Sequence, residues 1–311
     1  MCRPTPSCLS FAVAVALLLA TGCDRPSEAS SESSPTEPQP SQTEPSGFTA
    51  HQTKIGLRFS APEEWGAKLT PPAAFLDPPG HLPGKKKDDV LLALRFAPSD
   101  VEEATDEQYL DEMSKQFTDR ISGATLVKKQ RGLKTKAGPG SYIAWDVTGE
   151  WDVTKRVGFL MAFDQPWMFV LRASSTVDRM KTLREPLKEI FSTVDLATPE
   201  LDPEAVGTWK RVEPAKIKGK RYDQKLTLGD DGSFRLLSKR AYTSTDDEIV
   251  SVGRWAIDNG KMMQYVGNQL RGGIKMQTIE YELTGEGEVM AHGSGSSRAN
   301  WRRLAETGKR N

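Results

Sequence analysis

No cysteine follows Cys23 in this chain of 311 residues, so everything downstream must fold without a disulfide. The only other cysteines, Cys2 and Cys8, lie upstream of it. A body without crosslinks is held together by burial alone. The 265 residues from Gly47 to Asn311 are long enough to build two such domains.

The residues before Cys23 have the order of an export signal. Arg3 supplies a positive start, residues 9–20 are apolar apart from Ser10, and Gly22 is small. About a dozen apolar residues are too few to span roughly 30 Å of hydrocarbon, but they suit a cleavable signal. The segment resembles the lipobox of bacterial lipoproteins. That resemblance implies cleavage between Gly22 and Cys23 and a diacylglycerol on the Cys23 sulfur, with an ordinary secretory signal as the alternative.

We therefore expect residues 1–22 to be a signal peptide and the mature chain to begin at an acylated Cys23. Its acyl chains would anchor the protein to a membrane, because each buried methylene contributes about 0.8 kcal/mol. The folded domains would then lie in the cell envelope, outside the cytoplasm.

Residues 23–46 are predicted to be a disordered tether. From Asp24 to Ser46 there is no aromatic residue and no Leu, Ile, Val or Met, and five acidic residues face only Arg25, a net charge of −4. Such a segment cannot bury enough apolar surface to offset its chain entropy. As a flexible chain it would hold the folded part roughly 25–40 Å from the bilayer.

A cluster of proline and acidic residues at 198–203 predicts a domain boundary. We expect one domain over 47–198, a second over 199–304 and a disordered tail over 305–311. Residues 47–202 carry 21 basic and 23 acidic residues, and 203–311 carry 19 and 14. Neither balance is extreme and no basic stripe is interleaved with aromatics, so nucleic acid is not an expected partner.

The first domain alternates strand and helix signals. Predicted strands are Lys54–Ser60, Val90–Ala97, Ser141–Thr148 and a hairpin over Arg156–Ser174. A helix opening near Thr105 and running to Ile121 and a final helix over residues 177–191 are also predicted, with Pro186 expected to kink or divide the second.

Two segments of this domain resemble the PsbP and Mog1-like fold. They are the opening run Gly56–Trp65, with its strand, proline and tryptophan, and the closing run Glu189–Val194. The resemblance implies an α+β domain, with an antiparallel sheet flanked by helices. It also implies relatives that bind or organise other proteins rather than catalyse.

The second domain has the pattern of short antiparallel strands. Turns are predicted at Gly229–Gly232, Asp258–Gly260 and Gly285–Gly287. The Gly-x-Trp start at Gly207 and Trp209 and the basic closing strand resemble lipocalin-like domains, which implies a small all-β barrel. In that family an arginine near the end packs over the first tryptophan, so Arg302 or Arg303 would close the barrel.

Two features of the first domain are candidates for partner binding. Trp145 and Trp151 lie at an even spacing, so one strand would place both on the same face, which is either a docking site or core. Lys85, Lys86 and Lys87 end a long loop and could meet anionic headgroups, or form a solvated flap.

No catalytic constellation is present in the sequence. The three histidines are scattered, and none lies near a serine or cysteine arrangement that suggests a nucleophile. Met262, Met263, Met276 and Met290 with His292 suggest copper, but strand methionines are more often core.

We therefore expect no enzyme activity, no cofactor and no metal site. The leading hypothesis is a lipid-anchored envelope protein that binds or organises a protein partner. The alternative is a lipocalin-like carrier of a small apolar ligand or metal.

Overall fold

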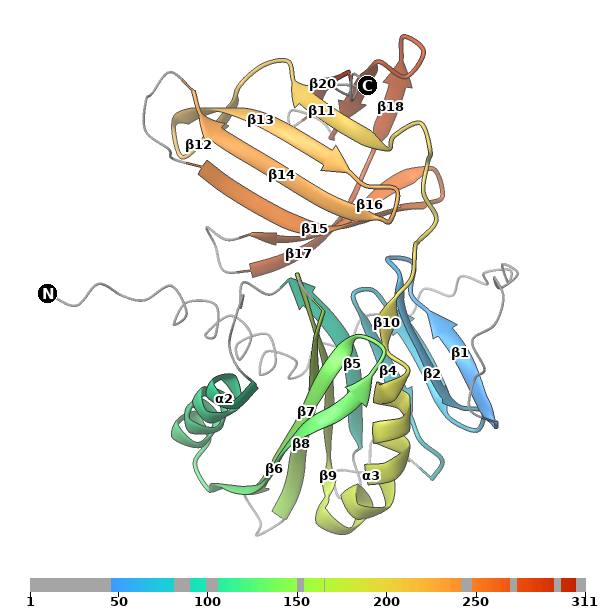
Figure 1. Ribbon diagram of the computed structural model, residues 1–311, viewed down its shortest axis with the longest axis vertical. Coiled ribbons are helices and arrows are strands. Elements are labelled where there is room, and N and C mark those ends of the chain that lie inside the picture. The colour runs from blue at the N-terminus through green and yellow to red at the C-terminus, as the bar shows by residue number, and fades with distance from the viewer. Residues whose placement is uncertain are drawn as a thin grey trace, which may run out of the picture.

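The computed structural model describes residues 46–80, 90–98, 106–149, 154–164, 166–241, 248–268, 273–293 and 298–305. The fold over these residues is mostly β, with two helices among them (Figure 1). The helices are α2 (Asp106–Arg120) and α3 (Val177–Ser192).

Seven antiparallel strands form the main sheet of the N-terminal half. In order across the sheet they are β3 (Gly66–Thr70), β4 (Ala73–Asp77), β5 (Leu91–Pro98), β9 (Trp167–Thr176), β8 (Thr154–Asp164), β7 (Gly138–Thr148) and β6 (Ala124–Thr135). A small second sheet contains β1 (Phe48–Gln52), β2 (Leu57–Pro62) and β10 (Asp195–Leu196).

Alternation along the central strands divides the side chains between two cores, one on each face of the seven-stranded sheet. In β9, Phe169 and Leu171 belong to one core, and Met168 and Val170 belong to the other. Figure 1 shows α2 and α3 on opposite faces of this sheet. Both faces are therefore covered, and the strands carry apolar residues in both directions.

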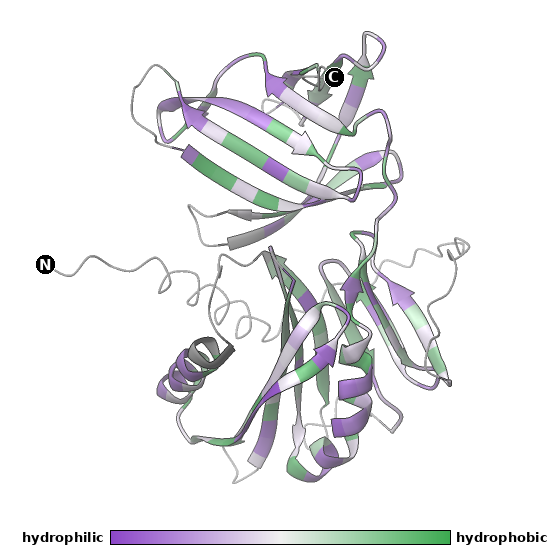
Figure 2. Ribbon diagram, viewed as in Figure 1, coloured by the Kyte–Doolittle hydropathy of each residue, from purple (hydrophilic) through white to green (hydrophobic). Residues whose placement is uncertain are grey.

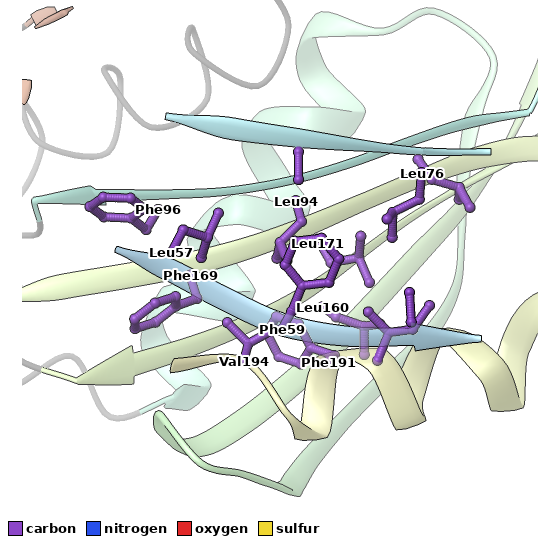
Figure 3. Packing of buried hydrophobic residues seen from close by; sticks show 14 of the residues in the cluster. Leu57, Phe59, Leu76, Leu94, Phe96, Leu160, Phe169, Leu171, Phe191 and Val194 are labelled. Atoms are coloured by element: carbon purple, nitrogen blue, oxygen red, sulfur yellow. The ribbon is translucent and has the colours of Figure 1, made fainter. Parts of the chain in front are cut away.

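The larger core lies between the sheet on one side and α3 and β2 on the other. Figure 3 shows Phe59 of β2 and Phe191 of α3 facing Leu160 and Leu171 of the sheet. The three-stranded sheet shares this face with α3, so the expected arrangement of helices flanking a sheet is matched only in part.

Pro186 lies inside the last helix and does not divide it, so the divided-helix alternative of the sequence-based prediction is wrong. The helix α3 continues from Val177 to Ser192 with the proline inside it. Proline removes one main-chain hydrogen bond and costs about 3 kcal/mol in a helix interior. Burial of Met180, Leu183, Leu187, Ile190 and Phe191 on the sheet outweighs that cost, since each contributes about 1.5–3 kcal/mol.

A single sheet forms the C-terminal half and curls into a nearly closed barrel. Its strands in order are β17 (Gly273–Ile279), β16 (Lys261–Asn268), β15 (Glu248–Asp258), β14 (Ser233–Arg240), β13 (Lys220–Leu228), β11 (Gly207–Arg211), β20 (Ala299–Arg303), β19 (Val289–His292) and β18 (Tyr281–Thr284), with β12 (Ala215–Ile217) paired to β13. The end strands β17 and β18 are separated in the chain only by Glu280. Along β13 to β15, hydrophilic and hydrophobic residues alternate (Figure 2).

The barrel interior is filled with large apolar side chains, including Trp209, Trp255 and Trp301. The predicted hairpin turns lie where expected. At the β15–β16 turn Asn259 and Gly260 both have positive φ, 51° and 71°, as a two-residue type I′ turn requires.

The outer face of β15 and β16 packs against the N-terminal half. Ala256, Met263 and Tyr265 point away from the barrel and belong to the larger core of the other half. The Arg254 side chain, only 4% exposed, donates to the carbonyl oxygens of Ile55 at 2.9 Å, Ala197 at 2.8 Å and Asp231 at 3.0 Å. The two halves are thus joined by a shared core and by the hydrogen bonds from the Arg254 side chain to the main-chain carbonyl oxygens of Ile55 and Ala197.

Candidate functional site

The strand β6 is an edge of the seven-stranded sheet. It pairs only with β7 among the described residues, so its outer edge has main-chain N–H and C=O groups without a neighbouring strand there. At 12 residues it is long for an edge strand. Two apolar side chains on it, Leu126 and Val127, are each 43% exposed.

The same segment is strongly basic. Lys128, Lys129, Arg131, Lys134 and Lys136 lie on or directly after β6, and residues 124–136 contain no acidic residue. We call these five residues the basic edge. Lys129 forms an ion pair with Asp111 of α2, whereas no ion pair of Lys134 or Lys136 is found among the described residues.

Two irregularities in the pairing of β6 with β7 limit which strands can pair with the outer edge of β6. The register shifts between Leu126 and Lys128 and again between Gln130 and Leu133. Bulges and lysines on an edge strand oppose pairing with a second identical edge, because like charges would face one another. The basic edge therefore disfavours a second copy of this chain and favours a partner of opposite charge.

An apolar cleft of about 250 Å³ adjoins the basic edge, between β6, β8 and α3. Leu133, Leu160 and Phe191 contribute apolar lining, and the charged lining residues are Lys134, Lys188 and Glu189. The Lys188 ammonium also pairs with Glu185 at 3.0 Å. This arrangement suits a partner that brings an apolar side chain flanked by carboxylates.

Trp145, one of the two predicted docking tryptophans, is in the core. It is fully buried and stacks on Phe117 of α2 with ring centroids 4.2 Å apart. The docking interpretation is therefore wrong for Trp145, because α2 covers this face of the sheet. The even spacing between Trp145 and Trp151 indicates only that both lie on one face of a strand, and it does not show whether another element packs on that face. Trp151 lies outside the described residues.

Several other predicted features also lie outside the described residues. They are the signal peptide 1–22 with Gly22, the acylated Cys23, the tether up to residue 45, the loop residues Lys85, Lys86 and Lys87, the helix start at Thr105 and the tail from 306 onward.

Arg303, one of the two arginines expected to close the barrel, lies over Trp209. Its guanidinium carbon is 4.4 Å from the centre of the indole, and it donates to the carbonyl oxygens of Gly287 at 2.9 Å and Val206 at 2.8 Å. Gly207 leaves room for it, since a Cβ there would lie 2.9 Å from the Arg303 Nη1. Arg302, the other candidate, is exposed.

The four methionines considered as copper ligands do not lie at one place in the structure. Met262 and Met290 are in the barrel interior, whereas Met263 and Met276 lie on the outer face against the other half. The described residues contain no group of three or more His, Cys, Asp or Glu that could hold a metal ion. Nor does any helix within them have the length and apolar character needed to cross a membrane.

The sequence matches no family model and no curated protein. Among solved structures, the chain is similar to the cyanobacterial PsbP protein CyanoP from Synechocystis sp. PCC 6803. The TM-score is 0.36 and the identity 11%, with 51% of this chain and 98% of that protein covered. CyanoP belongs to the group that the opening and closing runs resemble, but a likeness this distant carries no argument about function.

Proposed function

We propose that this protein is a non-catalytic, lipid-anchored protein of the cell envelope that binds an acidic segment of a partner protein along its basic edge. The observation that carries the proposal is that this basic strand edge, which no other strand covers among the described residues, lies next to an apolar cleft. The lipid anchor rests on the sequence before Cys23.

Charge supports an acidic partner. Five cations lie within 13 residues, and those at Lys134 and Lys136 have no ion pair among the described residues. Each carboxylate brought to such a surface gains little alone, but a run of them steers association and fixes its orientation. The cleft beside Leu133 and Phe191 adds a place for an apolar anchor, which supplies most of the affinity in typical interfaces.

A site-specific crosslink tests this proposal. A photo-reactive amino acid at Val127, which is exposed on the strand, is introduced into the full chain in its native membrane. The expected result is one reproducible protein adduct whose crosslinked peptide is rich in Asp or Glu. The double variant Lys134→Glu/Lys136→Glu should reduce the adduct about tenfold or more.

A matched charge reversal on the barrel is the control. Lys216→Glu/Lys220→Glu changes the net charge equally, at two exposed positions of the β12–β13 hairpin, and should leave the adduct unchanged. If both double variants reduce the adduct equally, the effect is one of net charge and the basic edge is not the binding site. Adducts with lipid only would also refute it.

The anchor has its own test. Cys23→Ser should move the chain from the membrane fraction to the soluble fraction, and the intact mass of the wild-type chain should show acyl groups on its amino-terminal residue. A Cys23→Ser variant that stays in the membrane fraction would contradict anchoring through this residue, whatever the crosslinking shows.

A further inference from the structure

Three cations lie side by side in one row across the wall of the barrel. Lys210 of β11 is directly paired with Lys225 of β13 on one side and with Arg302 of β20 on the other. Directly opposite residues of an antiparallel pair have Cβ atoms only about 4.5–5.5 Å apart, so like charges there destabilise a sheet. All three residues are exposed, and none has an ion pair within the described ranges. The fold therefore keeps a row of like charge that it does not neutralise.

The row belongs to a wider basic surface on the outside of the barrel. Trp209 and Trp301 point into the apolar core, so by alternation along their strands Lys210 and Arg302 point outward. The same alternation on all four strands β11, β13, β14 and β20 gives the charged outward residues Lys210, Arg221, Lys225, Arg235, Lys239, Arg302 and Asp223. Only the last of these is an anion. We call Lys210, Lys225, Arg235 and Arg302 the basic face.

The main chain of this surface is already used by the barrel. The strand β11 lies between β13 and β20, and β13 lies between β11 and β14. Unlike β6, these strands cannot pair with a further strand, so a partner meets only side chains. No aromatic residue is at an outward position of β11, β13, β14 or β20, so the surface offers no stacking platform for nucleic acid bases.

Two exposed apolar side chains flank the row. Val212 directly follows β11 and is 57% exposed, and Leu304 directly follows β20 and is 36% exposed. Because the two strands are antiparallel, these residues lie beyond opposite ends of the row, where Val212 N donates to the carbonyl oxygen of Asn300 at 2.9 Å and Leu304 N to that of Thr208 at 2.8 Å. Apolar side chains beside cations suit the boundary between lipid headgroups and acyl chains.

The N-terminal half does not cover this surface. Figure 1 shows β11 and β20 on the side of the barrel away from that half, which contains β6. Hydrophilic bands cross β13 and β14 in Figure 2. The basic face and the basic edge are therefore separate surfaces, one on each half of the molecule.

We infer that the basic face binds an anionic lipid surface, with the row of cations among phosphate-containing headgroups and with Val212 and Leu304 at their inner boundary. The inference rests on the lipid anchor of the proposed function for its location, and it does not use the basic edge. A chain held by its amino terminus needs only a weak second contact, since tethering gives a local concentration of roughly millimolar. Each cation near an anionic leaflet strengthens binding about fivefold.

Vesicle sedimentation tests this inference on the chain from residue 23 onward with Cys23→Ser, so that no acyl group contributes. Vesicles of phosphatidylcholine with about 30% phosphatidylglycerol should bind this chain, and vesicles of phosphatidylcholine alone should not. Raising the salt concentration from about 0.05 M to about 0.5 M should release it, because exposed charges are screened.

The substitution Lys210→Glu separates binding from folding. It places a carboxylate between Lys225 and Arg302, so the denaturant midpoint of unfolding should rise while vesicle binding weakens about tenfold or more. Lys68→Glu makes the same charge change at an exposed position of β3 and is the control. It should alter vesicle binding by about twofold or less, since it lies outside the contact.

Three results would overturn the inference. Equal weakening by Lys210→Glu and Lys68→Glu would mean that net charge alone is responsible. Weakening by Lys134→Glu but not by Lys210→Glu would mean that the basic edge holds the vesicles. Binding of polyglutamate that Lys210→Glu abolishes, without binding of vesicles, would mean that the basic face recognises an acidic protein segment. The crosslink from Val127 judges the proposed function separately, because it needs neither vesicles nor the basic face.

Discussion

The Tyr265 hydroxyl donates a hydrogen bond to the main-chain carbonyl oxygen of Phe96 at 2.5 Å, joining barrel strand β16 to sheet strand β5. The two residues are 169 positions apart, and their rings meet edge to face with centroids 5.0 Å apart. Burial raises the pKa of Tyr265, so the hydroxyl stays protonated and able to donate. This bond and the two that Arg254 makes to the carbonyl oxygens of Ile55 and Ala197 fix the orientation of the two halves.

Tyr265→Phe should destabilise the chain by about 1–2 kcal/mol. The ring and its packing on Phe96 remain, but the carbonyl oxygen loses its donor. Denaturant unfolding measures the loss. Tyr222→Phe is the control, since that tyrosine is also buried but no hydroxyl partner is found for it in the described part of the chain. Equal losses in both variants would mean that the hydrogen bond to Phe96 contributes nothing.

Arg254→Met should destabilise by roughly 2–4 kcal/mol, because the carbonyl oxygens of Ile55, Ala197 and Asp231 all lose a charged donor. Removing a buried charge recovers part of the loss, since burial already lowers the pKa of Arg254. The exposed Arg235→Met on β14 should change stability by less than about 0.5 kcal/mol. Thermal and denaturant unfolding of both variants would show whether Arg254 differs from a surface arginine.

Gly56→Ala should lower the free energy of unfolding by more than the strain of an alanine at positive φ alone explains. Gly56 has φ +92°, and a Cβ there would lie 2.2 Å from the carbonyl oxygen of Ala197, so the chain must move. Gly219→Ala has a similar φ of +77° with open space around it and costs only the conformational strain, about 1–2 kcal/mol. A loss at Gly56 no larger than that at Gly219 would show that the close approach of Ala197 is easily relaxed.

Stability should fall as the pH is lowered from about 6.5 to about 4, in part through His292. Burial first, and then the charge of Arg211, lowers its pKa from about 6.5 in the unfolded chain to about 4 in the folded chain, so the unfolded state binds a proton first and gains from acid. The contribution is fully present above pH 6.5 and lost below pH 4, and it amounts to about 3 kcal/mol at most. The difference in unfolding free energy between wild type and His292→Gln should become smaller, by about 3 kcal/mol at most, as the pH falls from about 6.5 to about 4. Parallel profiles would contradict it.

Local signals in the sequence predicted individual elements well. Glycine and asparagine at the β15–β16 and β18–β19 turns, and apolar periodicity in the helices, act through neighbouring residues, so they can be interpreted without the fold. The predicted division of the last helix at Pro186 is wrong for the opposite reason, because tertiary packing overrides the local signal. A helix that buries one face on a sheet tolerates a local penalty that the isolated segment would not.

The candidate sites depended on contacts that no local pattern encodes. The five cations around Lys134 are visible in the sequence, but their role depends on β6 being an edge, which strand order decides. In the sequence, Trp145 and Trp301 are the same residue type, and neither has a neighbouring pattern that indicates its environment. One is covered by Phe117 of α2, and the other lies beside Arg211.

By itself the sequence determined that no cysteine follows Cys23, and it predicted an export-type start, a polar tether and two strand-rich domains, since these predictions rest on composition and short-range pattern. Only the tertiary structure decided that Arg254 joins the halves, that β6 is an edge and that Trp145 packs under α2. Those properties arise from pairing between residues tens to hundreds of positions apart, and such pairing is set by the packing of the whole chain.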